Sequence, residues 1–400
     1  LVGGSGDGQL PNGVPIDRSL LDDWRPLPFE NGEWLSLRSC FQFASSGLES
    51  KRDHIVYAPN DHALIRQINE FLVLDGVAAT EQFNSTGMNP ASEAKAVGLD
   101  ATILRTAGYR PLDLQRHYPH PKWNDRLRTQ LSLAWGASNI CLFSLPSNIG
   151  VGPAAWAHSG YPDRHAFRGS YGGYAFPLYD RRVGPDAHNL NPILVDALAE
   201  AYGGAQTPED IFDAILCLLS AQSYTHKFAE DLEDTFPHIP FPADPAVFAR
   251  AAEVGREIRG LEAFQRDPAA VFRQKAFCKQ AADTDDGAVI ADVSYRDGEL
   301  SLWKADGQAV AAFTGLPEAV WSFSVSGYRV LPRWIDGRKG LPFTDALKTE
   351  LRDVAARIHE LIHWFAKADL VLAATLVETV TRAALGFPAP EPGEVDEGDD

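Results

Sequence analysis

The sequence of 400 residues is poor in cysteine, with only Cys40, Cys141, Cys217 and Cys278, and no two of them are spaced as CxxC. This pattern favours neither a disulfide framework nor a zinc ribbon, and the reduced thiols of a cytoplasmic protein are the simplest interpretation. Long apolar runs are also missing, since stretches such as 370–377 are far shorter than the roughly 20 residues of a membrane-spanning helix. We therefore expect a cytoplasmic location and no membrane partner.

Basic residues are in deficit, because 36 Lys and Arg face 54 Asp and Glu and leave a net charge of −18. Bulk charge thus argues against loose binding to nucleic acid or to an anionic membrane. The content of 45% hydrophobic and 10% aromatic residues excludes a disordered or collagen-like chain, and the length allows two or three domains. Because the chain starts at Leu1 with no signal region, we expect a piece of a longer protein.

The succession of sequence patterns predicts an α+β fold, with an irregular β-rich part, a helical region, a small β meander and C-terminal helices. In the first part, short apolar runs are separated by turn-forming residues, and only 62–74 shows a helical period. The expected parts are a Gly-rich linker at 1–23, an α/β part at 24–188, a helical part at 189–275, a meander at 276–343, helices at 344–387 and an acidic disordered tail at 388–400.

Three helix starts are indicated by capping residues. Thr207-Pro208 and Asp244-Pro245 each combine an N-cap side chain with a proline suited to the first helical position. Thr344 precedes a long apolar stripe at helical spacing, and a further helical segment is expected to run to about Leu385. These signals predict helices after 207, 244 and 344.

Extended structure is indicated at two further places. Asp297-Gly298 separates two apolar runs and is typical of a two-residue hairpin turn, because both residues tolerate positive φ. The run 320–330 could add another strand to this meander, whereas the prolines of 236–242 predict a rigid extended connector.

The sharpest catalytic motif is His359-Glu360-Leu361-Ile362-His363, which matches HExxH. In a zinc protease with this motif, two histidines one helical turn apart bind the metal and the glutamate activates water. A convincing third ligand is missing, because Asp369 takes its place in the metzincin spacing while Ala366 replaces the glycine that turns the chain back. We therefore reject the protease and interpret the motif as one face of a helix.

Other catalytic patterns are weaker still. Asp75 with Glu93 and Lys95 could mimic the metal-binding carboxylates of a nuclease, but such spacing is common on solvated surfaces. The Gly-rich run 3–8 has no preceding strand, so it does not fit a phosphate-binding loop. A GxSxG elbow and the paired prolines of an amino-methyltransferase motif are both absent from the sequence. We expect no catalytic residue in this chain.

The charge is unevenly distributed. Between Asp100 and Arg182 ten basic residues face five acidic ones, and tyrosine, tryptophan and histidine are interleaved with them. The stretch 328–339 repeats the mixture. Arginine outnumbers lysine in both, and its planar guanidinium suits guanine edges and phosphates. Such mixtures also occur on plain folded surfaces, so composition by itself leaves nucleic-acid binding as one of several interpretations.

Five blocks of the sequence resemble the C-terminal part of Type ISP-like restriction-modification enzymes and related large DNA methyltransferases. They extend in family order over most of 30–365, and one departure is Leu112, where the family usually has phenylalanine. The blocks are Ser45–Asp53 (similar to SGI-T-RD), Tyr109–Arg116 (YRPFDxR), Tyr174–Tyr179 (FPLY), the helices from Asn189 through Phe241, and Gly327–Lys339 (GYxVxxxWLxxRKG).

The resemblance implies a target-recognition domain, in which 24–188 is the DNA-reading part. The function implied is sequence-specific recognition of double-stranded DNA for an N6-adenine or N4-cytosine methyltransferase, or for a restriction-modification enzyme. Catalysis would belong to a methyltransferase domain, in cis or on a separate chain, which would hold S-adenosylmethionine; we expect no cofactor and no metal in this chain. The alternatives are a protein-interaction module of a larger defence enzyme and, with less support, a metal-dependent hydrolase.

Basic side chains within these blocks and the Arg-rich region are our candidates for DNA contact, whereas Asp53 and Asp113 are expected to orient neighbouring arginines. The candidates are Lys51, Arg52, Arg110, Arg116, Arg126, Arg128, Arg164, Arg168, Arg333, Arg338 and Lys339.

Overall fold

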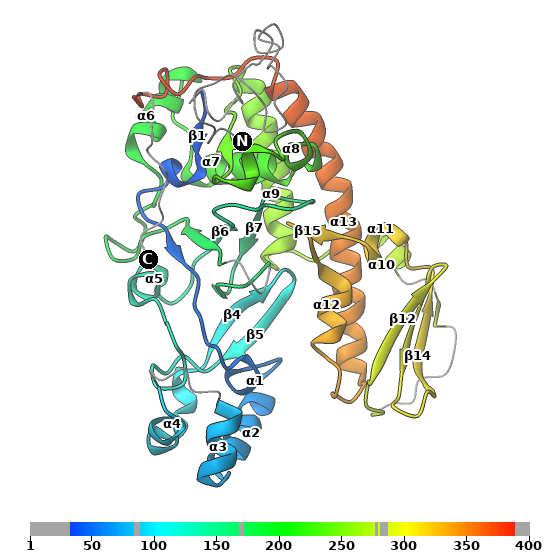
Figure 1. Cartoon of the computed structure of the whole chain (residues 1–400). Helices are drawn as coiled ribbons and strands as arrows, with labels where there is room; N and C mark the ends of the chain where they lie inside the picture. Colours follow the sequence, from blue (N-terminus) through cyan, green and yellow to red (C-terminus); the bar gives the residue numbers. More distant parts are fainter. Residues whose placement is uncertain (1–32, 84–88, 168–171, 277–278, 281–286, 389–400) are drawn as a thin grey trace, which may run out of the picture.

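The computed structural model describes residues 33–83, 89–167, 172–276, 279–280 and 287–388 (Figure 1). The expected linker at 1–23, residues 389–400 of the expected tail and Arg168 lie outside this part of the chain. Among the described residues, no helix is both long and apolar enough to cross a membrane.

Two four-stranded sheets lie near the middle of the molecule. One has the strand order β2-β9-β6-β7 and is antiparallel throughout. The other has the order β3-β5-β4-β8, with β4 and β8 parallel. Their bounds are β2 (Ser45–Ser46), β3 (Tyr57–Ala58), β4 (Arg105–Arg110), β5 (Asp113–His117), β6 (Cys141–Ser144), β7 (Ala155–His158), β8 (Tyr161–Pro162) and β9 (Tyr174–Pro177).

Short helices extend this β-rich part, and α2 (Asp61–Leu72) is the one that the sequence predicts. Its N-terminus is capped by Asn60, whose side chain accepts a hydrogen bond from the Ala63 amide. The others span eight residues or fewer, which is too short for a helical period to stand out in sequence. They are α1 (Asp53–Val56), α3 (Gly76–Phe83), α4 (Ala91–Val97) and α5 (Thr129–Trp135).

The helical region starts where the sequence predicts. Thr207 accepts a hydrogen bond from the Asp210 amide and Asp244 accepts one from the Ala246 amide, each just before a proline in the first turn. The predicted connector pairs β10 (His238–Ile239) with β1 (Leu35–Ser36). The helices are α6 (Pro192–Ala201), α7 (Pro208–Ser220), α8 (Gln222–Lys227) and α9 (Pro245–Glu262).

α7 and α9 pack closely, because α9 presents Gly255 to the backbone of α7. A Cβ at this position would overlap the carbonyl oxygen of Asp213. The same contact is reinforced by Arg259, whose Nε and Nη2 bond the two oxygens of the buried Asp213 carboxylate at 2.6 and 2.9 Å. A missing side chain and a bidentate ion pair therefore fix how the two helices cross.

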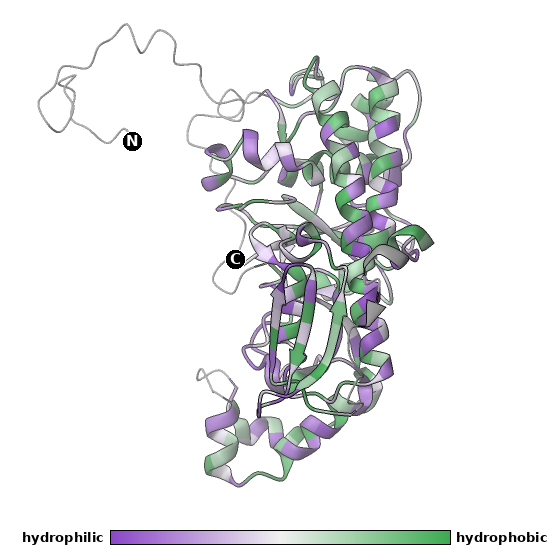
Figure 2. Ribbon diagram, turned by 90° about the vertical axis from the view of Figure 1, so that its right-hand side faces the viewer, coloured by the Kyte–Doolittle hydropathy of each residue, from purple (hydrophilic) through white to green (hydrophobic). Residues whose placement is uncertain are grey.

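The predicted meander is present as an antiparallel sheet of order β11-β14-β13-β12. Asp297 and Gly298 both have positive φ, 51° and 82°, as the predicted hairpin turn requires. Figure 2 looks onto this sheet and shows hydrophilic and hydrophobic residues mixed along its strands. The bounds are β11 (Lys279–Gln280), β12 (Asp292–Arg296), β13 (Glu299–Trp303) and β14 (Ala309–Thr314).

The prediction of a single strand over 320–330 is wrong. The segment begins with the short helix α11 (Glu318–Trp321) and then forms a small hairpin of β15 (Ser324–Val325) and β16 (Tyr328–Arg329). Its turn consists of Ser326 and Gly327, with φ of 46° and 78°, so the chain reverses and cannot continue as one strand. The helix α12 (Val330–Asp336) follows directly.

One long helix, α13 (Asp345–Thr375), runs along the molecule and is capped by Thr344 as predicted. Contrary to expectation, no second helical segment extends to Leu385 in this described stretch, because the helix ends at Thr375 and turns follow. The apolar side of α13 packs on α7, α8, α9 and α10 (Ala270–Ala276).

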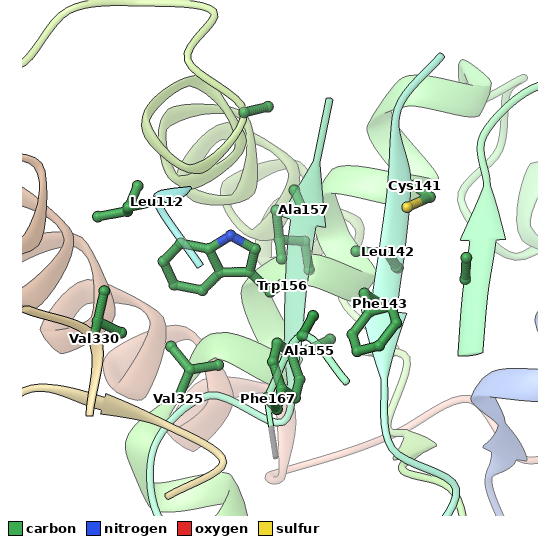
Figure 3. Close-up of a cluster of buried hydrophobic side chains, with 14 of the residues drawn as sticks. Leu112, Cys141, Leu142, Phe143, Ala155, Trp156, Ala157, Phe167, Val325 and Val330 are labelled. Carbon is green, nitrogen blue, oxygen red and sulfur yellow. The ribbon is translucent and has the colours of Figure 1, made fainter. Parts of the chain in front are cut away.

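The core joins the sheets to the C-terminal elements. Trp156 on β7 is fully buried, and Figure 3 shows its ring between Leu112 on one side and Val325 and Val330 on the other. Phe143 on the neighbouring β6 stacks edge-on to Phe167, with ring centroids 5.0 Å apart. Burial of these apolar side chains away from water is the main force that holds the parts together. The α+β class expected from the sequence is confirmed.

Candidate nucleic-acid interface

Three segments that are distant in sequence meet beside β2. The amide of Leu48 bonds the Pro162 carbonyl, and the Arg164 amide bonds the Leu48 carbonyl. On the other side, Glu49 and Arg126 exchange two backbone hydrogen bonds of 2.9 Å. Gly47 allows the close approach, because a Cβ there would lie 2.6 Å from the Arg164 nitrogen. The backbone thereby fixes where the side chains of all three segments start.

Three predicted basic residues converge on one carboxylate in this place. The carboxylate of Glu49 lies 3.7 Å from Lys51 Nζ, 4.0 Å from Arg126 Nε and 3.9 Å from Arg164 Nη1. Arg128 belongs to the same group, since its charge interacts with those of Arg164, Arg126 and Glu49. We call Glu49, Lys51, Arg126, Arg128 and Arg164 the Glu49 cluster.

Within the Glu49 cluster, Arg128 is the basic residue whose charge and N–H groups have the fewest partners among the described residues. Its backbone is left-handed, with φ of 55°, and its Nε and Nη2 are buried without a hydrogen-bond partner among the described residues. Burial lowers the pKa of its guanidinium, and the charges of Arg164 and Arg126 lower it further. A guanidinium in such a setting lacks an anion to accept its hydrogen bonds.

Arg110 is held in a buried network that includes Asp163, the residue before Arg164. Its Nη1 lies 2.9 Å from Asp163 and its Nη2 3.6 Å from Asp53. Tyr57 and Tyr109 donate hydrogen bonds to the same two carboxylates. The pKa of Arg110 is raised, because the attraction of Asp163 and its other neighbours outweighs the effect of burial. As the sequence predicts, Asp53 orients an arginine, and Arg110 itself has little freedom to contact a ligand.

Two predicted contact residues are buried. The guanidinium of Arg52 bonds the carbonyls of Phe83, Ser50 and Asn89 and lies over the Phe83 ring. Arg338 forms a bidentate ion pair with Asp113 at 2.8 and 2.9 Å. Both side chains are turned away from solvent by these bonds, so the structure favours structural roles for Arg52 and Arg338 over the DNA contact we expected.

The remaining predicted contacts differ in their freedom. Arg116 is engaged by Asp61, Thr106 and the Leu104 carbonyl. Lys339 bridges Asp292 and Asp336 at 3.0 and 3.1 Å, and these bonds raise its pKa. The side chain of Arg333 is 65% exposed, and its ion pair with Asp336 is loose, at 4.0 Å. Arg333 is therefore available to a ligand. These three lie outside the Glu49 cluster.

Tyr328 links the Arg110 network to α12. It is largely buried, which raises its pKa to about 12 and keeps the phenol neutral near pH 7, and the charged groups near it are Arg110, Asp113, Arg333 and Arg338. The basic stretch 328–339 therefore begins beside the Arg-rich sheet.

The HExxH residues lie on α13, and the glutamate is used inside the protein. Glu360 accepts hydrogen bonds from Arg266 Nη2, the Ala269 amide and Trp364 Nε1. These bonds lower its pKa against the opposing effect of burial. Within the described residues, no three His, Cys, Asp or Glu side chains are grouped so that they could hold a metal ion.

A cleft of about 710 Å³ separates the β4–β5 turn from α12 and α13. Its walls combine apolar side chains, such as Leu112 and Trp334, with charged ones that are mostly paired to each other, as Arg273 is with Asp267 and Asp353. Glu350 lines the cleft, and burial raises its pKa. The hydroxyl of Thr349, which also lines the cleft, donates its hydrogen bond to the Asp345 carbonyl.

Sequence reasoning missed Glu49, the centre of the cluster. It lies inside the Ser45–Asp53 block, two positions before Lys51. An acidic residue followed closely by two basic ones in a block of this kind is the available signal, but only the fold brings 126–128 and 164 to it.

The sequence model of the family described as "Type ISP C-terminal specificity domain" matches residues 39–361. The chain belongs to this family. The match contains every residue of the Glu49 cluster and the long helix as far as Leu361. The resemblance stated from the five blocks is thus confirmed.

Solved structures share the fold. A DrdV–DNA complex is similar with a TM-score of 0.58 and 19% identity, over 86% of this chain and 36% of that one. A nuclease-deletion mutant of the Type ISP restriction-modification enzyme LlaGI with a DNA substrate mimic gives 0.56 and 14%, over 91% and 30%. The ATP-dependent Type ISP enzyme LlaBIII bound to DNA gives 0.60 and 14%, over 93% and 25%.

The chain spans only about a quarter to just over a third of the length of these three proteins. A comparison with curated protein sequences gives no match.

Proposed function

We propose that this specificity domain recognises a specific sequence of double-stranded DNA on behalf of a restriction-modification enzyme. The observation that carries the proposal is the Glu49 cluster: four cationic side chains from three segments converge, in a chain whose net charge is −18. Concentrating positive charge at one place in an acidic protein favours a localised polyanion over non-specific attraction. The family and the DNA-bound relatives point to the same ligand.

The division of labour follows from the chemistry. An enzyme that modifies a base must extrude it from the duplex, so a second surface has to hold the register. Phosphate contacts would position this domain, and contacts to base edges in the grooves would specify the sequence. The methyltransferase domain, in cis or on a separate chain, would bind S-adenosylmethionine and methylate adenine N6 or cytosine N4, in the cytoplasm. This chain would contribute the recognition.

Equilibrium binding of the full chain to a labelled duplex tests the proposal. We expect binding that weakens steeply with salt, by roughly 0.9 in log K per log salt for each phosphate contact. Replacing Arg126, Arg128 and Arg164 together by Ala should lower affinity at least about tenfold at moderate salt and reduce the slope by roughly two to three.

A matched triple variant removes the same charge elsewhere. Arg66, Arg250 and Arg296 are exposed on α2, α9 and β12, and their replacement by Ala should change affinity far less. Equal losses for the two triple variants would place the DNA elsewhere on the chain. If the full chain did not bind duplex DNA even at low salt, DNA recognition would be wrong, and a protein-interaction module would be favoured.

A further inference from the structure

We propose that the Glu49 cluster is a phosphate-binding site in which Arg128 is the phosphate ligand and Glu49 is a built-in competing anion. The inference deepens the proposed function, because the phosphate would be one of the DNA backbone. It adds a role that opposes binding: the Glu49 carboxylate occupies the positive centre and thereby weakens the attraction for every DNA sequence alike.

The ion pairs of Glu49 are loose. Its three cationic neighbours stand at 3.7 to 4.0 Å, and its carboxylate makes no side-chain hydrogen bond among the described residues. The structural pairs of the same molecule are shorter, with 2.9 Å between Arg110 and Asp163 and 2.8 Å between Arg338 and Asp113. Glu49 therefore neutralises charge from a distance and leaves the cations' N–H groups free for a closer partner.

The backbone from which Arg126 and Arg164 extend is fixed independently of the Glu49 carboxylate. The main chain of Glu49 bonds that of Arg126, and the main chain of Leu48 bonds that of Arg164. Lys51 has a second partner, since its Nζ is 3.4 Å from the buried carboxylate of Asp125. The backbone of the site is thus already formed before a ligand arrives, which reduces the entropic cost of binding.

Arg128 shows which kind of ligand is missing. Two of its guanidinium nitrogens are buried with no acceptor in the described part of the chain, and two further arginines repel it. A neutral base edge could accept the hydrogen bonds but would not relieve that repulsion. A phosphate that approaches Nη1, which is not among these buried atoms, relieves the repulsion because it carries a negative charge. Its oxygens can accept hydrogen bonds from the other two nitrogens once the side chain turns toward it.

The competing carboxylate weakens binding to every DNA sequence without changing the preference for the correct one. Phosphate contacts are the same on every sequence, so they set the strength of sequence-blind binding. A negative charge fixed 3.7 to 4.0 Å from the phosphate-binding cations repels each incoming phosphate and weakens this common contribution. Base contacts are not affected, and the preference for the correct site is preserved.

Glu49→Gln in the full chain is the direct test, because it removes the competing charge and keeps the shape. Affinity for a duplex of unrelated sequence should rise several-fold at moderate salt, and affinity for the preferred sequence should rise by the same factor. Glu253→Gln is the matched control: Glu253 is exposed on α9, and its variant should bind as the original chain does. Lower affinity for E49Q, or a changed preferred sequence, would overturn the proposal and indicate that Glu49 contacts a base.

Arg128→Ala tests the phosphate ligand. We expect affinity to fall by a similar factor for all sequences and the salt slope to drop by roughly one. Arg128→Lys keeps the charge without the fork, so its affinity should lie between those of the original chain and R128A. Relaxed preference at one position of the DNA site would instead make Arg128 a base-reading residue. Thermal unfolding of each variant identifies any that does not fold. If an Arg128 variant does not fold, the result for E49Q decides whether the proposal holds.

Inorganic phosphate separates this inference from the proposed function. Added phosphate should raise the melting temperature of R128A least, that of the original chain more, and that of E49Q most. This difference without any duplex binding would contradict DNA recognition but keep the phosphate site. If the chain bound the duplex but neither substitution changed the binding of phosphate or of DNA, the phosphate site would be contradicted and DNA recognition would stand.

Discussion

At the scale of single residues, Glu262 shows how burial governs charge in this fold. It lies at the end of α9, where its Oε2 accepts a 2.7 Å hydrogen bond from the Ala157 amide, while Oε1 has no partner in the described part of the chain. Burial raises the pKa of its carboxyl well above 4.5, and the single hydrogen bond opposes this only in part. The folded chain thus holds the proton that the unfolded chain releases.

The resulting dependence on pH has a definite sign. Because the folded pKa is the higher one, the contribution of Glu262 to stability is complete below about pH 4.5 and is lost as pH rises toward the folded pKa. Glu262→Gln should remove this loss and make the chain more stable at pH 7, by roughly 1–3 kcal/mol. Urea unfolding from pH 5 to 8 measures it.

In that series, the original chain and E262Q should diverge with rising pH, with Glu253→Gln on the same helix following the original chain. Parallel curves for the original chain and E262Q would show that Glu262 has an ordinary pKa.

The same scale shows why single contact residues were hard to predict. Lys51 and Arg52 are neighbours in sequence, yet Lys51 is partly exposed beside Glu49 whereas Arg52 is buried against Phe83. Arg52 is buried because the fold packs residues 83 and 89 against it. No local sequence pattern contains that information. Arg126, Arg128 and Arg164 were among the predicted residues, but their common centre, Glu49, was not.

At the scale of elements, Arg338 ties α12 to the β4–β5 hairpin. It lies in the turn that follows α12, pairs with Asp113 at the start of β5 and lies over the ring of Trp334 on α12. Arg338→Met should destabilise the chain by about 3–5 kcal/mol, since it leaves a buried carboxylate unpaired. The double variant Asp113→Leu/Arg338→Met should recover most of that loss, because apolar groups can replace a buried pair.

Denaturant unfolding measures both variants, and duplex binding provides the contrast. If R338M weakened DNA binding while its unfolding midpoint stayed unchanged, Arg338 would be the DNA contact that the sequence suggested. A loss of stability that the double variant does not recover would contradict the tie between the two elements.

Elements were predictable where their signals are local. The caps at Thr207, Asp244 and Thr344 and the Asp297-Gly298 turn act within a few residues, and each appears in the structure. The segment 320–330 was misjudged because a Ser-Gly turn with positive φ interrupts an otherwise apolar run. The close crossing of α7 and α9 at Gly255 depends on two helices meeting, so the sequence of neither one reveals it.

At the scale of the whole molecule, an acidic chain gathers cations at the Glu49 cluster, where we propose that it reads a duplex. The uneven charge could be predicted from the sequence, and so could the α+β class and the family. The site could not, because three segments had to fold together before the positive stretch acquired a centre and a competing carboxylate.

Selection of duplexes from a random-sequence pool by the full chain tests this claim most directly. We expect enrichment of one sequence pattern, which should be the same for R128A and E49Q although their affinities change in opposite directions. Binding without enrichment of any pattern would contradict a role in sequence recognition.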